Sequence, residues 1–213
     1  MKRLILIVWI FAGIVGTATA QKTRLNAYSA YVFDDKVDSY YDPGRYYNGT
    51  IKGGYQWGVG LEFMANKSKG IELKYLRQDT HAPMNYYNNG AKNKDFGLSV
   101  NYILLGGSNY FQTGGKVEPY FGLGLGMAII DIKDPVPNGS TSETKFAWDV
   151  KLGTNIWFSE RVGLKLQIEL VSAVQSAGGG FYFGTGGSGA GITTYSTMYQ
   201  FGMGGGLAFK FGK

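Results

Sequence analysis

Apolar residues alternate with polar residues or glycine along several stretches, each about as long as the ten residues of a membrane-spanning strand. The clearest stretch runs from Tyr55 to Met64 and reads Tyr-Gln-Trp-Gly-Val-Gly-Leu-Glu-Phe-Met. Successive side chains of a β-strand point to opposite faces, so this stretch has one apolar and one polar face. The pattern therefore predicts β-strands that separate an apolar environment from a polar one.

Eight such segments follow one another and are the predicted strands. They span residues 24–33, 55–64, 70–77, 95–105, 117–130, 146–158, 162–174 and 197–211. Odd-numbered strands are followed by long connections, and even-numbered strands mostly by short ones. The long connections are 34–54, 78–94, 131–145 and 175–196, and the others are 65–69, 106–116 and 159–161. Short turns on one side and long extracellular loops on the other are typical of outer-membrane barrels.

The apolar face of each predicted strand is expected to contact lipid. On the fourth strand this face consists of Phe96, Leu98, Val100, Tyr102 and Leu104. Aromatic residues also recur near strand ends, where a membrane barrel carries aromatic girdles at its two interfaces. These residues are Tyr55, Trp57, Phe63, Phe96, Phe146, Trp148, Phe158, Phe209 and Phe211.

The polar faces carry charges of both signs, which we expect to pair across the lumen. This predicted interior network consists of Glu62, Glu72, Lys74, Glu118, Asp149, Lys151, Lys165, Glu169 and Lys210. The interior of an eight-stranded barrel is just wide enough to be filled by side chains, so a plugged core is expected. A soluble barrel with an apolar interior fits the same alternation, but a water-facing surface would be richer in charge than these glycine-rich faces.

The first 20 residues have the three zones of a secretory signal peptide. Lys2 and Arg3 form the basic start, Leu4–Val15 is almost wholly apolar, and Ala18-Thr19-Ala20 supplies small residues for cleavage before Gln21. The apolar run is shorter than the roughly 20 residues of a spanning helix. We therefore expect a signal peptide over residues 1–20 and a single barrel domain over residues 21–213.

Composition agrees with an exported membrane barrel. Charged residues make up 17% of the chain, below the roughly 25% of soluble domains, whereas aromatic residues make up 15% and there are 34 glycines. The net charge of +6 comes from scattered basic residues, so no nucleic-acid partner is predicted. With one histidine and no cysteine, no metal site or other cofactor is predicted either.

The last strand ends in Leu207-Ala208-Phe209-Lys210-Phe211, followed by Gly212 and Lys213. This ending is similar to the aromatic-rich final strand of outer-membrane barrels. With the signal peptide and the eight strands, the whole mature chain resembles the small eight-stranded outer-membrane proteins of the OmpA-barrel, OmpX and OmpW kind. The resemblance implies an all-β, antiparallel, up-and-down transmembrane barrel in a bacterial outer membrane, and it carries no residue-level motif for function.

The predicted outer loops are rich in tyrosine, asparagine and glycine, a composition typical of adaptable binding surfaces. The candidate surface-binding residues are Tyr40, Tyr41, Tyr46, Tyr47, Tyr86, Tyr87, Phe181 and Tyr182. We expect a monomer with a structural or surface-binding role, whose partners are outer-membrane lipid and an extracellular ligand. The aromatic residues would alternatively only pack the loops or sit at the lipid interface.

Two other functions remain open from the sequence. Interior glycines would leave room for a narrow channel for small solutes. A lipid-modifying enzyme is the other alternative, and it would use His81, which follows Asp79 in the second long loop, with Ser172, Ser176 or Ser196 as nucleophile. No spacing requires such a pair, so a solvated loop histidine and a protein without enzymatic activity are the favoured interpretation.

Overall fold

The computed structural model describes residues 22–42, 45–87, 91–133, 140–174, 180–184, 187–191 and 198–212. Every helix or strand assigned within these ranges is a β-strand. No helix in the described part of the chain is long and apolar enough to cross a membrane. The predicted signal peptide lies outside the described residues.

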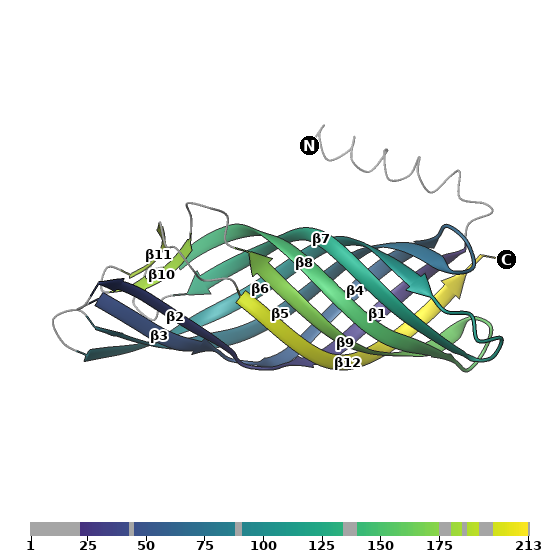
Figure 1. The fold of residues 1–213 in the computed structure, drawn as a ribbon, viewed down its shortest axis with the longest axis horizontal. Helices are drawn as coiled ribbons and strands as arrows, with labels where there is room; N and C mark the ends of the chain where they lie inside the picture. The colour runs from purple at the N-terminus through teal and green to yellow at the C-terminus, as the bar shows by residue number, and fades with distance from the viewer. Residues whose placement is uncertain are drawn as a thin grey trace, which may run out of the picture.

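Eight strands form a closed antiparallel wall (Figure 1). They are β1 (Thr23–Val32), β4 (Gly54–Met64), β5 (Lys69–Tyr87), β6 (Ala91–Tyr110), β7 (Val117–Lys133), β8 (Ser140–Trp157), β9 (Val162–Val174) and β12 (Met198–Phe211). Each strand pairs with the next of this series, and β12 pairs with β1, which closes the barrel. The predicted eight-stranded up-and-down barrel is therefore confirmed.

The predicted loops contain more regular structure than the alternation indicated. Residues 34–54 hold the hairpin β2 (Asp35–Asp42) and β3 (Arg45–Ile51), and residues 175–196 hold β10 (Gly180–Gly184) and β11 (Gly187–Gly191). The prediction of loops over 78–94 and 106–116 was wrong, because the β5–β6 ladder runs unbroken from Lys69 opposite Asn109 to Tyr87 opposite Ala91. The turn after β6 is consequently only residues 111–116.

Beyond the wall, β2 and β3 form one sheet with the end of β5 and the start of β6. We call it the projecting sheet. Its backbone is continuous with the barrel because β3 pairs with β5 through Tyr47–Tyr86, Asn48–Asn85 and Gly49–Met84. In Figure 1 this sheet lies at the end opposite the start of β1 and the end of β12. It is therefore on the side of the long connections.

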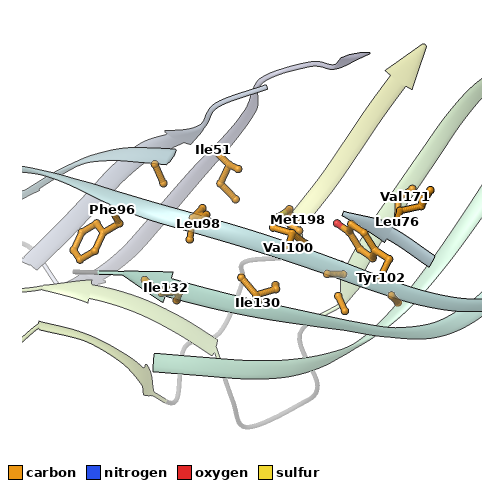
Figure 2. Packing of buried hydrophobic residues seen from close by; sticks show 14 of the residues in the cluster. Ile51, Leu76, Phe96, Leu98, Val100, Tyr102, Ile130, Ile132, Val171 and Met198 are labelled. Carbon is orange, nitrogen blue, oxygen red and sulfur yellow. The ribbon is translucent and has the colours of Figure 1, made fainter. Parts of the chain in front are cut away.

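The outward faces of most wall strands are apolar and exposed, as Val59, Leu125 and Met203 illustrate. Strand β6 differs from the others in that its inward face is also apolar. Its residues Phe96, Leu98, Val100, Tyr102 and Leu104 are buried in the interior (Figure 2), so the prediction that they face lipid, and that Phe96 belongs to a girdle, was wrong. The outward residues Ile103 and Leu105 are apolar as well, so alternation there did not define the lipid side.

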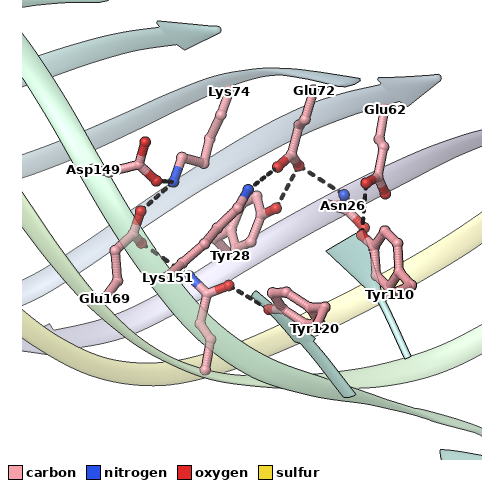
Figure 3. A network of polar contacts seen from close by, with 11 residues as sticks. Asn26, Tyr28, Glu62, Glu72, Lys74, Tyr110, Tyr120, Asp149, Lys151 and Glu169 are labelled. Atoms are coloured by element: carbon pink, nitrogen blue, oxygen red, sulfur yellow. Dashed lines mark hydrogen bonds and ion pairs between the residues drawn. The ribbon is translucent and has the colours of Figure 1, made fainter. Parts of the chain in front are cut away.

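The lumen has two chemically different halves. Near the projecting sheet it is filled by an apolar cluster that includes Ile51, Met84, Ile130, Ile132 and Met198 (Figure 2). Near the short turns it holds charged and hydrogen-bonding side chains (Figure 3). The side chains that could carry chemistry are therefore concentrated in one half of the barrel.

Candidate functional site

Lys74 lies between two carboxyl groups of the interior network (Figure 3). Its ammonium nitrogen Nζ lies 2.8 Å from Asp149 Oδ2 and also contacts a carboxylate oxygen of Glu169. Gln167 donates from Nε2 to the other Glu169 oxygen at 2.9 Å. One buried cation therefore contacts two carboxyl groups that reach it from β8 and β9, and a buried charge requires such a partner.

Glu72, on the same strand as Lys74, accepts hydrogen bonds from three side chains. Lys151 Nζ lies 2.5 Å from Oε2, and Asn26 Nδ2 donates to Oε1 at 2.7 Å. The Tyr28 hydroxyl donates to the same Oε1. Because β1, β5 and β8 meet at this carboxylate, the contacts hold the barrel together across its lumen.

A third group surrounds Glu118, closer to the short turns. Arg24 donates from both Nη atoms to the Glu118 oxygens, at 2.9 and 3.0 Å. Asn155 Nδ2 and Trp157 Nε1 add further donations at 3.0 and 3.2 Å. The guanidinium also lies 4.5 Å above the centre of the Tyr110 ring. Bidentate pairing of this kind fixes the geometry of both side chains.

The remaining predicted network residues have no carboxylate–cation contact among the described residues. Glu62 accepts a hydrogen bond of 2.6 Å from the Tyr110 hydroxyl. Lys165 Nζ lies 4.4 Å from the centre of the Tyr120 ring, and Lys210 Nζ lies 3.4 Å from that of Trp157. Of the nine predicted residues, the structure buries all but Lys210, which is half-buried near the barrel end.

Sequence reasoning missed several members of this network. They are Arg24, Asn26, Tyr28, Gln78, Tyr110 and Tyr120, all buried. Arg24, Asn26 and Tyr28 occupy alternate positions of the first strand, and this spacing could have identified them. Tyr110 fell in the predicted connection 106–116, and Tyr28 and Tyr120 were assigned to neither face, although a buried tyrosine hydroxyl usually finds a polar partner.

Inward glycines stand opposite the network carboxylates. A Cβ atom at Gly60 would lie 2.1 Å from Glu72 Oε1, and one at Gly124 would lie 2.1 Å from Asp149 Oδ1. No real side chain tolerates such distances, so glycine at these positions leaves the volume that the carboxylates occupy. The glycine-rich polar faces are thus part of the network.

On the side of the ion pairs that faces the projecting sheet, hydrogen bonds between neutral side chains cross the lumen. The Tyr102 hydroxyl donates to Gln200 Oε1 at 2.7 Å, and Gln200 Nε2 donates to Gln78 Oε1 at 2.6 Å. A cavity beside Gln200 and Glu169 has a volume of only about 10 Å³, scarcely room for one water molecule. The described interior at this level is therefore filled.

The candidate surface-binding residues are distributed over four strands beyond the wall. Tyr40 and Tyr41 lie on β2, Tyr46 and Tyr47 on β3, Tyr86 and Tyr87 on β5, and Phe181 and Tyr182 on β10. The backbone register sets Tyr40 opposite Tyr46, and Tyr47 opposite Tyr86. Residues from two predicted loops thus occupy adjacent positions of the projecting sheet.

The base of the projecting sheet is fixed to the barrel by hydrogen bonds around Asp34. Its carboxylate accepts the Gly53 N–H at 2.8 Å and contacts Lys52 Nζ at 2.9 Å. These two interactions lower the pKa of the exposed Asp34 carboxyl below its usual value. Lys52 N–H in turn donates to the His81 carbonyl at 2.9 Å, which connects the hairpin to β5.

The prediction that His81 lies in a loop was wrong. His81 is part of β5, and the hydrogen-bonded ladder between β5 and β6 continues past it. Its side chain is exposed, whereas Ser172 is fully buried in β9, opposite Trp148 and Tyr199. Ser176 and Ser196 lie outside the described residues. Within the described ranges, no group of three or more histidine, aspartate or glutamate residues is arranged to hold a metal ion.

Comparisons with known proteins agree with this geometry. The family model of the outer membrane protein β-barrel domain matches residues 12–180. The crystal structure of OprG from Pseudomonas aeruginosa is similar with a TM-score of 0.61 and 17% identity, over 92% of this chain and 98% of that one. Neisserial surface protein A (NspA) is similar with a TM-score of 0.54 and 14% identity, over 90% and 97% of the two chains.

No curated protein matches the chain in sequence. Identities this low show a shared fold and do not show a shared activity. The family match is different in kind, because it extends over more than half of the chain. This protein therefore belongs to the outer membrane protein β-barrel domain family, and it is a bacterial outer-membrane β-barrel.

Proposed function

We propose that this protein is a non-enzymatic cell-surface binding protein, in which the barrel is a rigid anchor and the projecting sheet is the contact surface. The observation that carries the proposal is the register of β2, β3 and β5, which gathers tyrosine positions from two separate loops onto one sheet. Tyrosine offers a large contact area at a low cost in conformational entropy.

The lengths of the strands support an extracellular position for this surface. A tilted strand needs about 9–11 residues to span a bilayer. Strand β5 has 19 residues and β6 has 20, so both continue well beyond the lipid. At ~3.3 Å per residue, the remaining eight or so residues carry the sheet roughly 26 Å along the strand direction.

The filled lumen counts against the alternative of a solute channel. Lys74 with its carboxylates occupies the lumen near mid-barrel, and the apolar cluster fills the half near the projecting sheet. A permeating solute would have to separate buried ion pairs, which costs several kcal/mol for each uncompensated charge. We expect no single-channel steps when the protein is reconstituted into planar bilayers, and steady unitary currents would contradict this part of the proposal.

Binding is tested with the protein in nanodiscs on arrays of glycans and extracellular-matrix proteins. In the test variant, Tyr40, Tyr46, Tyr47 and Tyr86 are replaced by serine, and we expect every specific signal to fall at least about tenfold. The matched control replaces Ser142 and Thr144 on the outward face of β8 by alanine and should bind as the wild type does. Unchanged binding by the tyrosine variant, or no binding by the wild type, would contradict the proposed surface.

A purely structural role makes a different prediction in the source bacterium. A strain lacking the protein, complemented with the tyrosine variant, should regain detergent resistance but not surface binding if the proposal is correct. If only envelope resistance depends on the protein, and the variant restores it fully, the barrel itself is the functional part.

A further inference from the structure

The end of the barrel with the short turns contains a second, chemically distinct feature. An open pocket of about 410 Å³ lies in the mouth of the lumen. Its lining includes the cationic side chains of Lys22, Arg24, Lys67 and Lys210, and a single carboxylate, that of Glu118. Its volume is within the range of about 300–1,000 Å³ typical of small-molecule sites.

The one carboxylate in the pocket is already satisfied. Glu118 accepts hydrogen bonds from both Arg24 Nη atoms and from Asn155 and Trp157. Among the described residues, no carboxylate lies within ion-pair distance of the ammonium groups of Lys22, Lys67 and Lys210. The mouth therefore concentrates three positive charges that have no carboxylate within ion-pair distance among the described residues, around a floor where Glu118 is paired with Arg24.

Hydrogen bonds hold the walls of this pocket in place. Asn66 Oδ1 accepts the N–H groups of Ser68 and Lys69, at 2.8 and 2.9 Å, which fixes the turn that carries Lys67. Gln112 Nε2 donates to the Lys67 carbonyl at 2.7 Å and thus connects this turn to the next one. Two turns and the start of β1 form one ordered rim, because Met64 N–H donates to the Lys22 carbonyl at 3.0 Å.

We propose that this mouth is a binding site for a small polyanion that carries phosphate or carboxylate groups, offered from the periplasmic side. Lys22, Lys67 and Lys210 would bind the anionic oxygens, and Arg24 would stay paired with Glu118 as the floor. Lys210 lies over the Trp157 ring at 3.4 Å, so an anion that draws its ammonium away would change the environment of this indole. The site is independent of the surface proposed for extracellular binding.

Trp157 serves as the reporter in the test. Four tryptophans occur in the sequence, and Trp9 lies in the predicted signal peptide, which is absent from the mature barrel. A variant with Trp57 and Trp148 replaced by phenylalanine therefore keeps Trp157 alone in the mature protein. This protein is inserted into phosphatidylcholine nanodiscs and titrated with inorganic pyrophosphate. We expect a saturable change in fluorescence with a Kd below about 1 mM. A linear or absent response up to that concentration would overturn the proposal.

Matched charge substitutions separate the pocket from the general charge of the rim. In the Trp157 background, K22Q together with K67Q should raise the Kd at least about tenfold, because two charge-assisted contacts are lost while Lys210 stays over the Trp157 ring as the reporting cation. K69Q together with K116Q removes the same charge from the first residue of β5 and from the turn after β6, neither of which lines the pocket, and should change the Kd less than about threefold. Equal weakening by both pairs would overturn the proposal. Heat-modifiable migration verifies that each variant is folded, and K22Q repeats the test with a single substitution.

The source of the anion is distinguished by the lipid. If pyrophosphate saturates the site in phosphatidylcholine nanodiscs and phosphatidylglycerol has no effect, the ligand is a soluble periplasmic anion. If nanodiscs with phosphatidylglycerol produce the Trp157 change alone, and pyrophosphate then competes with it, the pocket binds a lipid headgroup. Either result supports the site, provided that K22Q with K67Q weakens the response at least about tenfold.

Discussion

The Lys74 ion pairs are expected to be among the largest single contributions to the stability of the barrel. The Lys74 side chain is 2% exposed, and those of Asp149 and Glu169 are 1% and 6% exposed. Replacing Lys74 with methionine keeps most of the side-chain volume but leaves two carboxylates buried beside each other. Removing one partner of a buried pair costs about 3–5 kcal/mol, and two stranded carboxylates place this variant at the upper end.

The assay is equilibrium urea unfolding in lipid vesicles, followed by tryptophan fluorescence and by heat-modifiable migration. K74M should lose about 4–5 kcal/mol of unfolding free energy, whereas K74M with D149N and E169Q should recover most of it because no unpaired charge remains. Lys52→Met removes an exposed pair with Asp34 and should leave the unfolding midpoint unchanged. A K74M loss below about 1 kcal/mol, the range of surface pairs, would refute the inference that the lumen is dry and plugged.

Three further predictions concern other parts of the chain. Gly124→Ala places a Cβ 2.1 Å from a network oxygen and should destabilise the barrel by about 1–3 kcal/mol, whereas Gly107→Ala meets nothing closer than 3.9 Å and should be neutral in the same unfolding assay. The hydrogen bond from Gly53 keeps the pKa of Asp34 below its usual 3.8, so the stability that this carboxylate provides is complete above 3.8 and is lost as the pH falls through the lower folded value. The Gly53 amide NMR signal should shift with pH as Asp34 titrates, and D34N should abolish this shift. A midpoint at or above pH 3.8 would contradict the lowered pKa of Asp34. N-terminal sequencing of protein from outer membranes should begin at Gln21, and an intact precursor there would contradict cleavage.

Alternation alone was enough to predict the barrel and most of its faces. On β7, inward Gly122 and Gly124 and outward Leu123 and Leu125 differ so strongly that only one orientation is possible. On β6 the run Tyr102-Ile103-Leu104-Leu105 is apolar on both sides, and the lipid side could not be predicted. Orientation there is decided by the neighbours of β6 in the closed wall.

The contacts within the network could not be predicted in the same way. Lys74 and Glu169 are 95 residues apart, and Arg24 and Glu118 are 94 residues apart. Which inward side chains meet depends on the stagger of the strands around the barrel, and one residue of slippage would turn each side chain to the other face. The polar composition of the lumen follows from sequence, whereas the pairing follows only from register.

The reversal of polarity along single strands explains why the projecting sheet was read as loops. In the first half of β5, Glu72 and Lys74 point inward while Leu73 is outside, as a lipid-embedded wall requires. In the second half, Ala82 and Met84 are buried inside while His81 is exposed. Both halves alternate in the same register, but the exterior has changed from lipid to water, so the apolar residues move to the interior as in a soluble barrel. A sequence pattern with one apolar, lipid-facing side stops where the exterior changes from lipid to water. The end of that pattern therefore marks the edge of the membrane, whereas the strand itself continues beyond it.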